Sequence, residues 1–186
     1  MLIVEGPDGS GKSTLVRRLS KDLNLPVASR VVSADTTALV DLAEWTERNV
    51  AAGFQHTIFD RHRLVSEPIY GPILRPRQET KFLDFGWMSN VVWQFYQAKP
   101  VIIYCMPDLR TVWSNISDPD SDNGVFEGRY AEVEAIYAAY INRAVHDATR
   151  GVGRLYNYKS TVYADVLGWA RMKMEDARDR ALAHTA

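Results

Sequence analysis

The sequence predicts one three-layer α/β/α domain built on a mainly parallel sheet of five strands. Short apolar runs alternate with helix-length amphipathic segments along the 186 residues, without repeats or low-complexity tracts. A glycine-rich turn joins the first apolar run to the first helical segment. Strands that alternate with helices form βαβ units, whose right-handed crossovers produce a parallel sheet with helices on both faces. The length suits a single domain with a sizeable core.

The first third of the chain begins this alternation. The apolar run 2–4 predicts a buried strand, and leucines spaced four apart predict a helix over 13–23. A proline ends that helix and opens an extended run over 27–32. Apolar periodicity predicts a helix over 39–52, and the β-branched segment 56–60 predicts a strand.

The middle of the chain is richer in turn-forming residues. Three prolines and a glycine within 61–80 lead us to expect a helical turn or two but no long helix. A helix over 88–98 precedes the run 101–105, which is apolar at nearly every position, as expected for a strand covered on both faces. A short helix over 109–116 and a polar loop over 117–124 follow.

The last third returns to long elements. We expect a helix over 125–149, a strand over 154–158 and a terminal helix over 161–183. The whole chain, 1–186, is then one domain with a lid-like loop at about 117–129.

Residues 6–13 read GPDGSGKS and fit the phosphate-binding pattern G-x-x-x-x-G-K-[ST] of a P-loop. The match follows an apolar strand and opens a helix, so backbone N–H groups and the helix N-terminus would converge on the phosphates. Lys12 would reach the β- and γ-phosphates, and Ser13 would offer its hydroxyl to Mg²⁺. The candidate residues for binding a nucleoside triphosphate are Gly6, Asp8, Gly9, Ser10, Gly11, Lys12, Ser13 and Thr14.

Asp60 and Arg61 end the predicted strand 56–60, at the edge where ligands bind in open α/β sheets. A carboxylate there can hold a Mg²⁺-bound water or accept the proton of an attacking hydroxyl, and the guanidinium can neutralise phosphate oxygens. A surface ion pair at a strand end remains the alternative interpretation.

Further arginines are candidates for phosphate contacts. Arg61, Arg63, Arg75 and Arg77 place four guanidinium groups within seventeen residues, separated by prolines, a glycine and an aromatic residue. Neighbouring residues of these types are typical of a rigid pocket wall. The alternative interpretation is a run of solvated charges. Arg129 follows the polar loop and would add positive charge if the loop closes over the phosphates.

Four aromatic residues lie close together in the sequence. These residues are Trp87, Trp93, Phe95 and Tyr96. Their side chains either stack on a base or belong to the hydrophobic core.

The charge balance limits the classes of partner. The formal net charge is −1, with 22 Lys and Arg against 23 Asp and Glu, which argues against a long nucleic acid as ligand. Sixteen of the 22 cations are Arg, whose planar fork suits phosphate. The single cysteine, Cys105, favours a reducing compartment and a buried apolar role. With no signal-peptide pattern and no apolar run long enough to cross a bilayer, we expect a soluble cytoplasmic protein.

Four segments resemble thymidylate kinase-like nucleoside and nucleoside monophosphate kinases. VEGPDGSGKST resembles the acidic P-loop opening of that family, and FDRH resembles its Asp-Arg-aromatic motif at the end of the third strand. SEPIYGPILR is similar to a segment of small phage-type deoxynucleotide kinases, and RLYNYKST resembles the last strand and the nucleotide-base loop. The resemblance covers nearly the whole chain and implies a P-loop kinase fold.

The resemblance also implies roles for individual residues. Asp8 would lie near the sugar of the acceptor, Asp60 would act on Mg²⁺ or the attacking oxygen, and Arg61 would hold the acceptor phosphate. The loop with Arg129 would correspond to the lid. Further residues expected on the acceptor side are Glu67, Tyr70 and Arg75.

Two features depart from the pattern of thymidylate kinases. His62 stands where those enzymes usually have Tyr, and Arg129 is the only arginine between Arg110 and Arg143. These departures bear on the identity of the acceptor more than on kinase chemistry.

The leading hypothesis is transfer of a phosphoryl group from ATP, with Mg²⁺, to a deoxynucleoside monophosphate. Its catalytic residues would be Lys12, Asp60, Arg61 and Arg129. A deoxynucleoside or a hydroxymethylated pyrimidine, free or within DNA, is the alternative acceptor, and a homodimer is left open. A P-loop switch protein is the alternative from another class, although the sequence has no N-K-x-D tetrad to read guanine.

Overall fold

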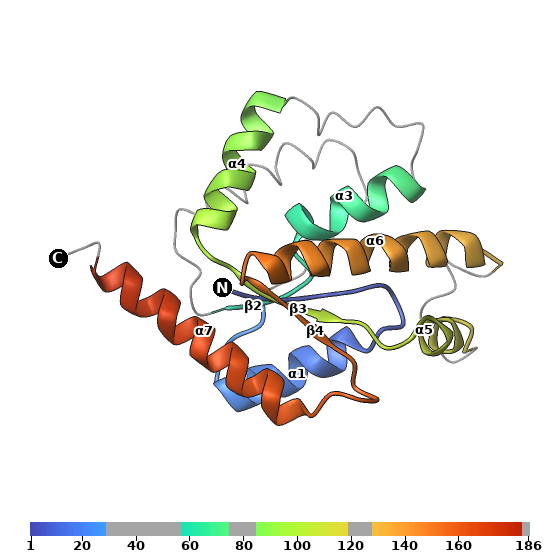
Figure 1. Ribbon diagram of the computed structural model, residues 1–186. Helices are drawn as coiled ribbons and strands as arrows, with labels where there is room; N and C mark the ends of the chain where they lie inside the picture. Colours follow the sequence, from blue (N-terminus) through green and yellow to red (C-terminus); the bar gives the residue numbers. More distant parts are fainter. Residues whose placement is uncertain (29–56, 75–84, 119–127, 184–186) are drawn as a thin grey trace.

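The computed structural model describes residues 1–28, 57–74, 85–118 and 128–183 (Figure 1). Within these ranges four parallel strands form one sheet in the order β2-β1-β3-β4. The strands are β1 (Leu2–Glu5), β2 (Ile58–Asp60), β3 (Val101–Cys105) and β4 (Gly153–Tyr156). Each strand that β1 contacts starts in register with it, because Leu2 pairs with Ile58 on one side and with Val101 on the other. The carboxyl ends of these strands therefore meet at one edge of the sheet.

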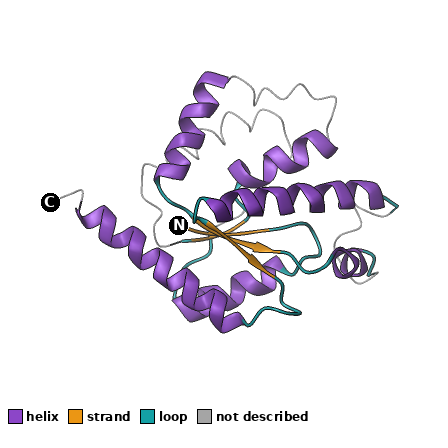
Figure 2. Cartoon of the chain, viewed as in Figure 1, coloured by secondary structure: helices purple, strands orange, loops and turns teal. Residues whose placement is uncertain are grey.

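Helices cover both faces of this sheet and make three layers (Figures 1 and 2). On one face lie α1 (Lys12–Leu23) and α7 (Tyr163–Ala183), and on the other lie α3 (Arg63–Leu74), α4 (Phe85–Gln97) and α6 (Tyr130–Thr149). The short helix α5 (Leu109–Ile116) lies beside the carboxyl edge.

Alternation along the strands separates two hydrophobic cores. In β1, Leu2 and Val4 pack with the α1 and α7 side, whereas Ile3 packs with the α3 and α6 side. Successive side chains of a strand point to opposite faces, so three apolar residues in a row serve both cores. The α/β class and the parallel sheet predicted from the sequence are confirmed.

The fifth predicted strand is not found among the described residues. Of the run 27–32, Val27 forms an isolated parallel bridge with Ile58, and the run continues outside the described residues. The predicted helix 39–52 and most of the lid-like loop also lie outside them. The helix expected over 125–149 begins at Tyr130 in the structure, after Gly128, whose φ of 71° lies in the left-handed region.

The proline-rich segment after β2 contradicts the sequence expectation. We expected no long helix there, but α3 extends over Arg63–Leu74 with Pro68 and Pro72 inside it. The two prolines stand four residues apart and are exposed, whereas Val65 and Ile69 are buried against the sheet. Proline rings that face solvent leave the apolar side intact, and burial of that side offsets the lost backbone hydrogen bonds. Arg63 consequently begins a helix instead of lining an irregular pocket wall.

In the described part of the chain, no helix combines the length and apolar character needed to cross a membrane. The same residues contain no cluster of three or more His, Cys, Asp or Glu side chains suited to holding a metal ion.

Candidate active site

The P-loop joins β1 to α1 at the carboxyl edge of the sheet, and its glycines are required by close packing. Gly6 has a φ of 140°, and a Cβ there would lie 2.4 Å from the carbonyl oxygen of Cys105. Gly9 has a φ of 72°, and its Cβ would lie 2.8 Å from the carbonyl oxygen of Val112. Only glycine allows the loop to lie this close to β3 and α5.

Side chains from distant segments fix the loop backbone. Asn115 of α5 donates from Nδ2 to the carbonyl oxygen of Gly9 at 2.7 Å, and the Cys105 thiol donates to the carbonyl oxygen of Ser10 at 2.9 Å. The Tyr158 ring lies beside Gly11, where a Cβ would approach it to 3.2 Å. Cys105 is buried, as expected, and burial raises the pKa of its thiol to about 12. The roles of Asn115 and Tyr158 were not predicted, because single polar residues in a helix or loop carry no local signal.

The predicted triphosphate-binding residues all lie in this loop or in the first turn of α1. They are Gly6, Asp8, Gly9, Ser10, Gly11, Lys12, Ser13 and Thr14.

Lys12 begins α1 and is buried, with its Nζ donating to the carbonyl oxygen of Pro7 across the loop. Burial, together with the positive charge of Arg61, lowers the pKa of Lys12 to about 8, although Asp8 and Asp60 oppose the shift. The ammonium group therefore lies inside the loop, within the same electrostatic cluster as Arg61 and both carboxylates.

Ser13 and Asp60 meet although they are 47 residues apart in the sequence: the Ser13 hydroxyl donates to Asp60 Oδ2 at 3.1 Å. One residue comes from the first turn of α1 and the other from the end of β2. A hydroxyl beside a carboxylate is the hard-oxygen donor set that suits Mg²⁺, which usually takes one or two protein ligands and completes its shell with water and phosphate. These residues fit a Mg²⁺ ion held jointly with nucleotide phosphates.

Asp8, Arg61 and Tyr70 form a cluster that joins the P-loop to the end of β2 and to α3. Arg61 Nη2 donates to Asp8 Oδ1 and, at 3.0 Å, to the Tyr70 hydroxyl. That hydroxyl donates in turn to Asp8 Oδ2 at 3.1 Å and accepts from the Asp8 backbone N–H at 3.2 Å. Burial raises the pKa of Asp8, but the positive charges of Arg61 and Lys12 outweigh burial and hold the pKa below its usual value.

Arg61 has an unusual backbone as well as a central position. Its φ of 70° lies in the left-handed region, which is uncommon for a residue with a side chain. Its backbone N–H donates to the carbonyl oxygen of Val4 at 3.0 Å, which continues the pairing of β2 with β1 by one residue. Strained backbone of this kind is found most often at functional sites.

Glu5 is a buried acid beneath this cluster that the sequence interpretation missed. Its Oε1 accepts from the His62 backbone N–H at 2.6 Å, and its Oε2 accepts from the Tyr140 hydroxyl at 3.0 Å. Burial raises the pKa of Glu5 to about 7, and the His62 N–H and the charge of Arg61 partly counteract it. An acidic residue that ends an otherwise apolar strand was the available signal.

His62, which departs from the family pattern, is a core residue in this structure. Its ring lies between Phe59 and Phe95, with ring centres 5.4 Å and 4.9 Å away. Burial lowers the pKa of His62 to about 4, so the ring is neutral at physiological pH. Phe95 accordingly belongs to the core, whereas Trp93 is 61% exposed.

The remaining predicted residues are placed less centrally. Tyr70 lies in the cluster, while Glu67 is half-buried one turn earlier on α3. Arg129 directly precedes α6, whose first turn lies on the carboxyl side of the sheet (Figure 1). Its Nε forms an ion pair with Glu132 Oε1 at 3.2 Å. Arg75 lies outside the described residues.

Two buried polar atoms of the site, Ser10 Oγ and Arg61 Nε, have no hydrogen-bond partner among the described residues. Buried polar atoms are nearly always paired, so exceptions call for an explanation such as a ligand or water. Both atoms lie beside the P-loop, where phosphate oxygens could accept from them.

A second polar network lies toward the opposite edge, around Asp147 near the end of α6. Its fully buried carboxylate accepts from the hydroxyls of Tyr96 at 2.8 Å and Tyr104 at 2.5 Å, and from Arg143 Nε at 3.1 Å. Burial works to raise the pKa of Asp147, but these hydrogen bonds and the charge of Arg143 hold it below its usual value.

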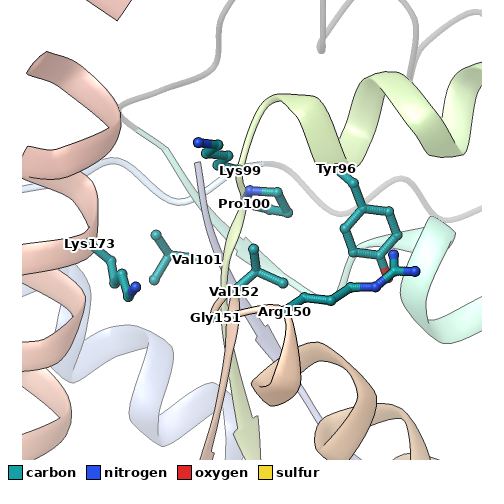
Figure 3. A pocket seen from close by; sticks show the side chains of 8 residues that line it. All are labelled: Tyr96, Lys99, Pro100, Val101, Arg150, Gly151, Val152 and Lys173. Carbon is teal, nitrogen blue, oxygen red and sulfur yellow. The ribbon is translucent and has the colours of Figure 1, made fainter. Parts of the chain in front are cut away.

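A hollow of about 280 Å³ lies beside this network at the amino edge of the sheet (Figure 3). Its lining includes Lys99, Arg150 and Lys173, and the Arg150 guanidinium lies 4.9 Å from the centre of the Tyr96 ring. Lys99 and Arg150 follow the last turns of α4 and α6, where a cation stabilises the negative end of a helix. The positive lining thus has a structural explanation.

Comparison with known proteins gives no match to a protein-family model and none to a curated protein. Solved structures, however, match over nearly the whole chain. Deoxyadenosine kinase from M. mycoides with bound dCTP has a TM-score of 0.53 and 17% identity, and the match covers 98% of this chain and 100% of that one. The same kinase with bound dATP has a TM-score of 0.51 and 15% identity, covering 97% of each chain.

The YorR protein of Bacillus subtilis, in complex with phosphorylated GDP, has a TM-score of 0.54 and 14% identity, covering 100% of this chain and 98% of that one. At such identities the likeness shows the fold. The chain has the α/β fold with a parallel sheet that these nucleotide-binding structures share, including that of a kinase.

Proposed function

We propose that the protein is a kinase that transfers the γ-phosphoryl group of ATP to a small deoxynucleoside-type acceptor. One observation carries the proposal: the P-loop, the Ser13 to Asp60 pair and the Asp8, Arg61 and Tyr70 cluster all lie together at the carboxyl edge of the sheet. This edge is where ligands bind in open α/β folds. The fold that the chain shares with deoxyadenosine kinase also supports the proposed kinase function.

The residues divide the work between donor and acceptor. The P-loop backbone and Lys12 bind the triphosphate and stabilise the charge that develops on the transferred group. Ser13 and Asp60 would hold Mg²⁺, which would supply positive charge to the phosphate oxygens. Arg61 and Arg129 supply further positive charge. With a deoxynucleoside as acceptor, Asp60 would instead accept the proton of the attacking hydroxyl.

For the acceptor we propose a deoxynucleoside monophosphate. Arg61 lies next to the P-loop lysine, and its Nε lacks a hydrogen-bond partner among the described residues, which suits an acceptor phosphate. Glu67 and Arg75 complete the acceptor side in this proposal.

A deoxynucleoside is the second candidate, and one contact favours it. Arg61 is already ion-paired with Asp8, so its charge is partly satisfied without an acceptor phosphate. Asp8 would then receive a sugar hydroxyl. The balanced net charge of −1 makes a small molecule a better acceptor than DNA.

The deciding experiment measures ADP formation from ATP and Mg²⁺ with each common deoxynucleoside and each deoxynucleoside monophosphate. We expect one monophosphate to raise ADP formation far above the rate without acceptor. Stimulation by the deoxynucleosides alone would select the second candidate. ADP formation that no acceptor changes would contradict the kinase proposal and favour a nucleotide switch.

A further inference from the structure

Glu5 is the one acid of the site whose place is not explained by contact with phosphate, Mg²⁺ or acceptor. Its side chain is 0% exposed, and both of its carboxylate oxygens accept hydrogen bonds from inside the protein. Taking a carboxylate out of water is costly unless it is hydrogen-bonded, and an apolar residue of similar volume often serves stability better. An acid at this position therefore calls for a role other than stabilising the core.

The first bond of Glu5 holds the turn that carries Arg61. Two consecutive backbone N–H groups leave β2 toward the end of β1: that of Arg61 donates to the Val4 carbonyl oxygen at 3.0 Å, and that of His62 donates to Glu5 Oε1 at 2.6 Å. Between them the chain adopts the left-handed φ of 70° at Arg61. A strand directs only alternate N–H groups toward a given neighbour, so the ladder has no carbonyl oxygen for the second of these two amides, and the Glu5 carboxylate accepts from it instead.

The second bond of Glu5 holds the wall behind the Arg61 side chain. The Tyr140 hydroxyl donates to Glu5 Oε2 at 3.0 Å, and the Tyr140 ring packs edge to face on Tyr70, with ring centres 6.0 Å apart. Tyr70 in turn accepts from Arg61 Nη2 at 3.0 Å. Both supports of the guanidinium, its backbone turn and its tyrosine neighbour, thus lead back to one carboxylate.

We propose that Glu5 is a positioning residue: it fixes the left-handed turn at Arg61 and the Tyr140 to Tyr70 contact, so that the Arg61 guanidinium faces the acceptor. The proposal rests on the proposed function, because it assigns the acceptor to Arg61. Glu5 itself touches neither donor nor acceptor.

Three substitutions separate positioning from folding. Glu5→Leu removes both bonds, Tyr140→Phe removes one, and Glu5→Gln keeps an oxygen for the His62 N–H and places an amide toward the Tyr140 hydroxyl, which can then accept. We expect Glu5→Leu to raise the KM for the acceptor about ten-fold or more, because small misplacements of binding groups have effects of this size. The KM for ATP should stay close to wild type, Tyr140→Phe should give a smaller change in the same direction, and Glu5→Gln should restore most of the loss.

Asp147→Asn is the matched control, since it alters another buried, hydrogen-bonded carboxylate, which lies in the last turn of α6. It should destabilise the fold and leave both KM values unchanged. If Glu5→Leu behaves in the same way, with both KM values unchanged, Glu5 is only a structural residue and the proposal is wrong.

Crystal structures of Glu5→Gln, Tyr140→Phe and, where it folds, Glu5→Leu give a readout that needs no activity. In Glu5→Leu we expect Arg61 to leave the left-handed region and to lose its contact with Asp8. In Tyr140→Phe we expect Arg61 to keep its left-handed φ while Tyr70 shifts. An unmoved Arg61 in Glu5→Leu would overturn the proposal, and if that variant does not fold, an unmoved Tyr70 in Tyr140→Phe would do so. Failure of the proposed kinase function would show separately, as absence of transfer by the wild-type protein to any acceptor.

Discussion

The two buried polar networks of this protein use the same chemical groups but differ in completeness. Around Asp147, tyrosine hydroxyls and an arginine donate to a carboxylate within and between regular elements, α4, β3 and α6. Around Asp8, the same types of group lie on a glycine loop and on Arg61, whose φ is 70°. Only the second region holds Ser10 Oγ and Arg61 Nε, which lack partners among the described residues.

This difference separates a region built for stability from one built for binding. A satisfied buried network stabilises the fold and fixes its packing. Strained backbone and unpaired polar atoms cost free energy in the folded protein, and a bound ligand can offset that cost by pairing with them. At the carboxyl edge of the sheet, where the P-loop lies (the P-loop edge), we expect substitutions to change activity with little effect on folding. Around Asp147 we expect substitutions to lower stability with little effect on activity.

The largest effect is expected for Lys12→Ala. Loss of the ammonium group should lower kcat by about a thousand-fold or more, as for other groups that stabilise the transferred phosphoryl. The midpoint of thermal unfolding should change little, because Lys12 is buried at a cost and its Nζ donates to its own loop, at the carbonyl oxygen of Pro7. Steady-state kinetics and circular dichroism check both parts, and normal turnover in this variant would remove the P-loop from the account.

A smaller loss is expected for Ser13→Ala. Asp60 remains as a ligand, so we expect kcat at low Mg²⁺ to fall by about a hundred-fold and to recover in part as Mg²⁺ is raised. Titration of the rate with Mg²⁺ measures this, with Ser20→Ala on the same helix as the control. Equal Mg²⁺ dependence in Ser13→Ala and wild type would contradict the assignment of the metal site.

The effect of Asp147→Asn should fall on stability. Loss of hydrogen bonds to an ionised carboxylate should lower the free energy of unfolding by about 2 kcal/mol, with kcat per folded molecule unchanged. Urea unfolding followed by fluorescence measures the first quantity. A selective loss of activity at full stability would show that the two regions are not separate.

The same variant has a predictable pH dependence. The pKa of Asp147 is lower in the folded than in the unfolded protein, so the unfolded state binds more protons in acid. The stabilising contribution is therefore present above the usual aspartate pKa of about 4 and is lost as the pH falls below it. Wild type should lose more stability than Asp147→Asn between pH 5 and pH 3, and parallel losses would contradict this assignment.

The fold and the P-loop edge could be predicted from the sequence because their signals are local. The apolar run Val101–Cys105 and the glycine spacing before Lys12 each lie within a few residues. The meeting of Ser13 with Asp60 also follows, because the carboxyl ends of parallel strands share one edge.

Other features depend on packing that no local pattern reveals. The helix α3 forms despite two internal prolines because the side opposite them is buried. That burial exists only when the helix packs on the sheet. The bond from Tyr140 to Glu5 joins residues 135 positions apart, and that from Tyr104 to Asp147 spans 43. Because the two residues of each pair lie on different elements, neither carries a local signal of its partner.

The most direct test of the central claim follows the γ-phosphoryl group itself. Wild-type protein is incubated with γ-labelled ATP, Mg²⁺ and the acceptor that most stimulates ADP formation, and the labelled products are separated. We expect the label on the acceptor for wild type, and neither labelled acceptor nor released phosphate above background for Lys12→Ala. Label that appears only as inorganic phosphate, whatever acceptor is present, would contradict a phosphotransferase at the P-loop edge.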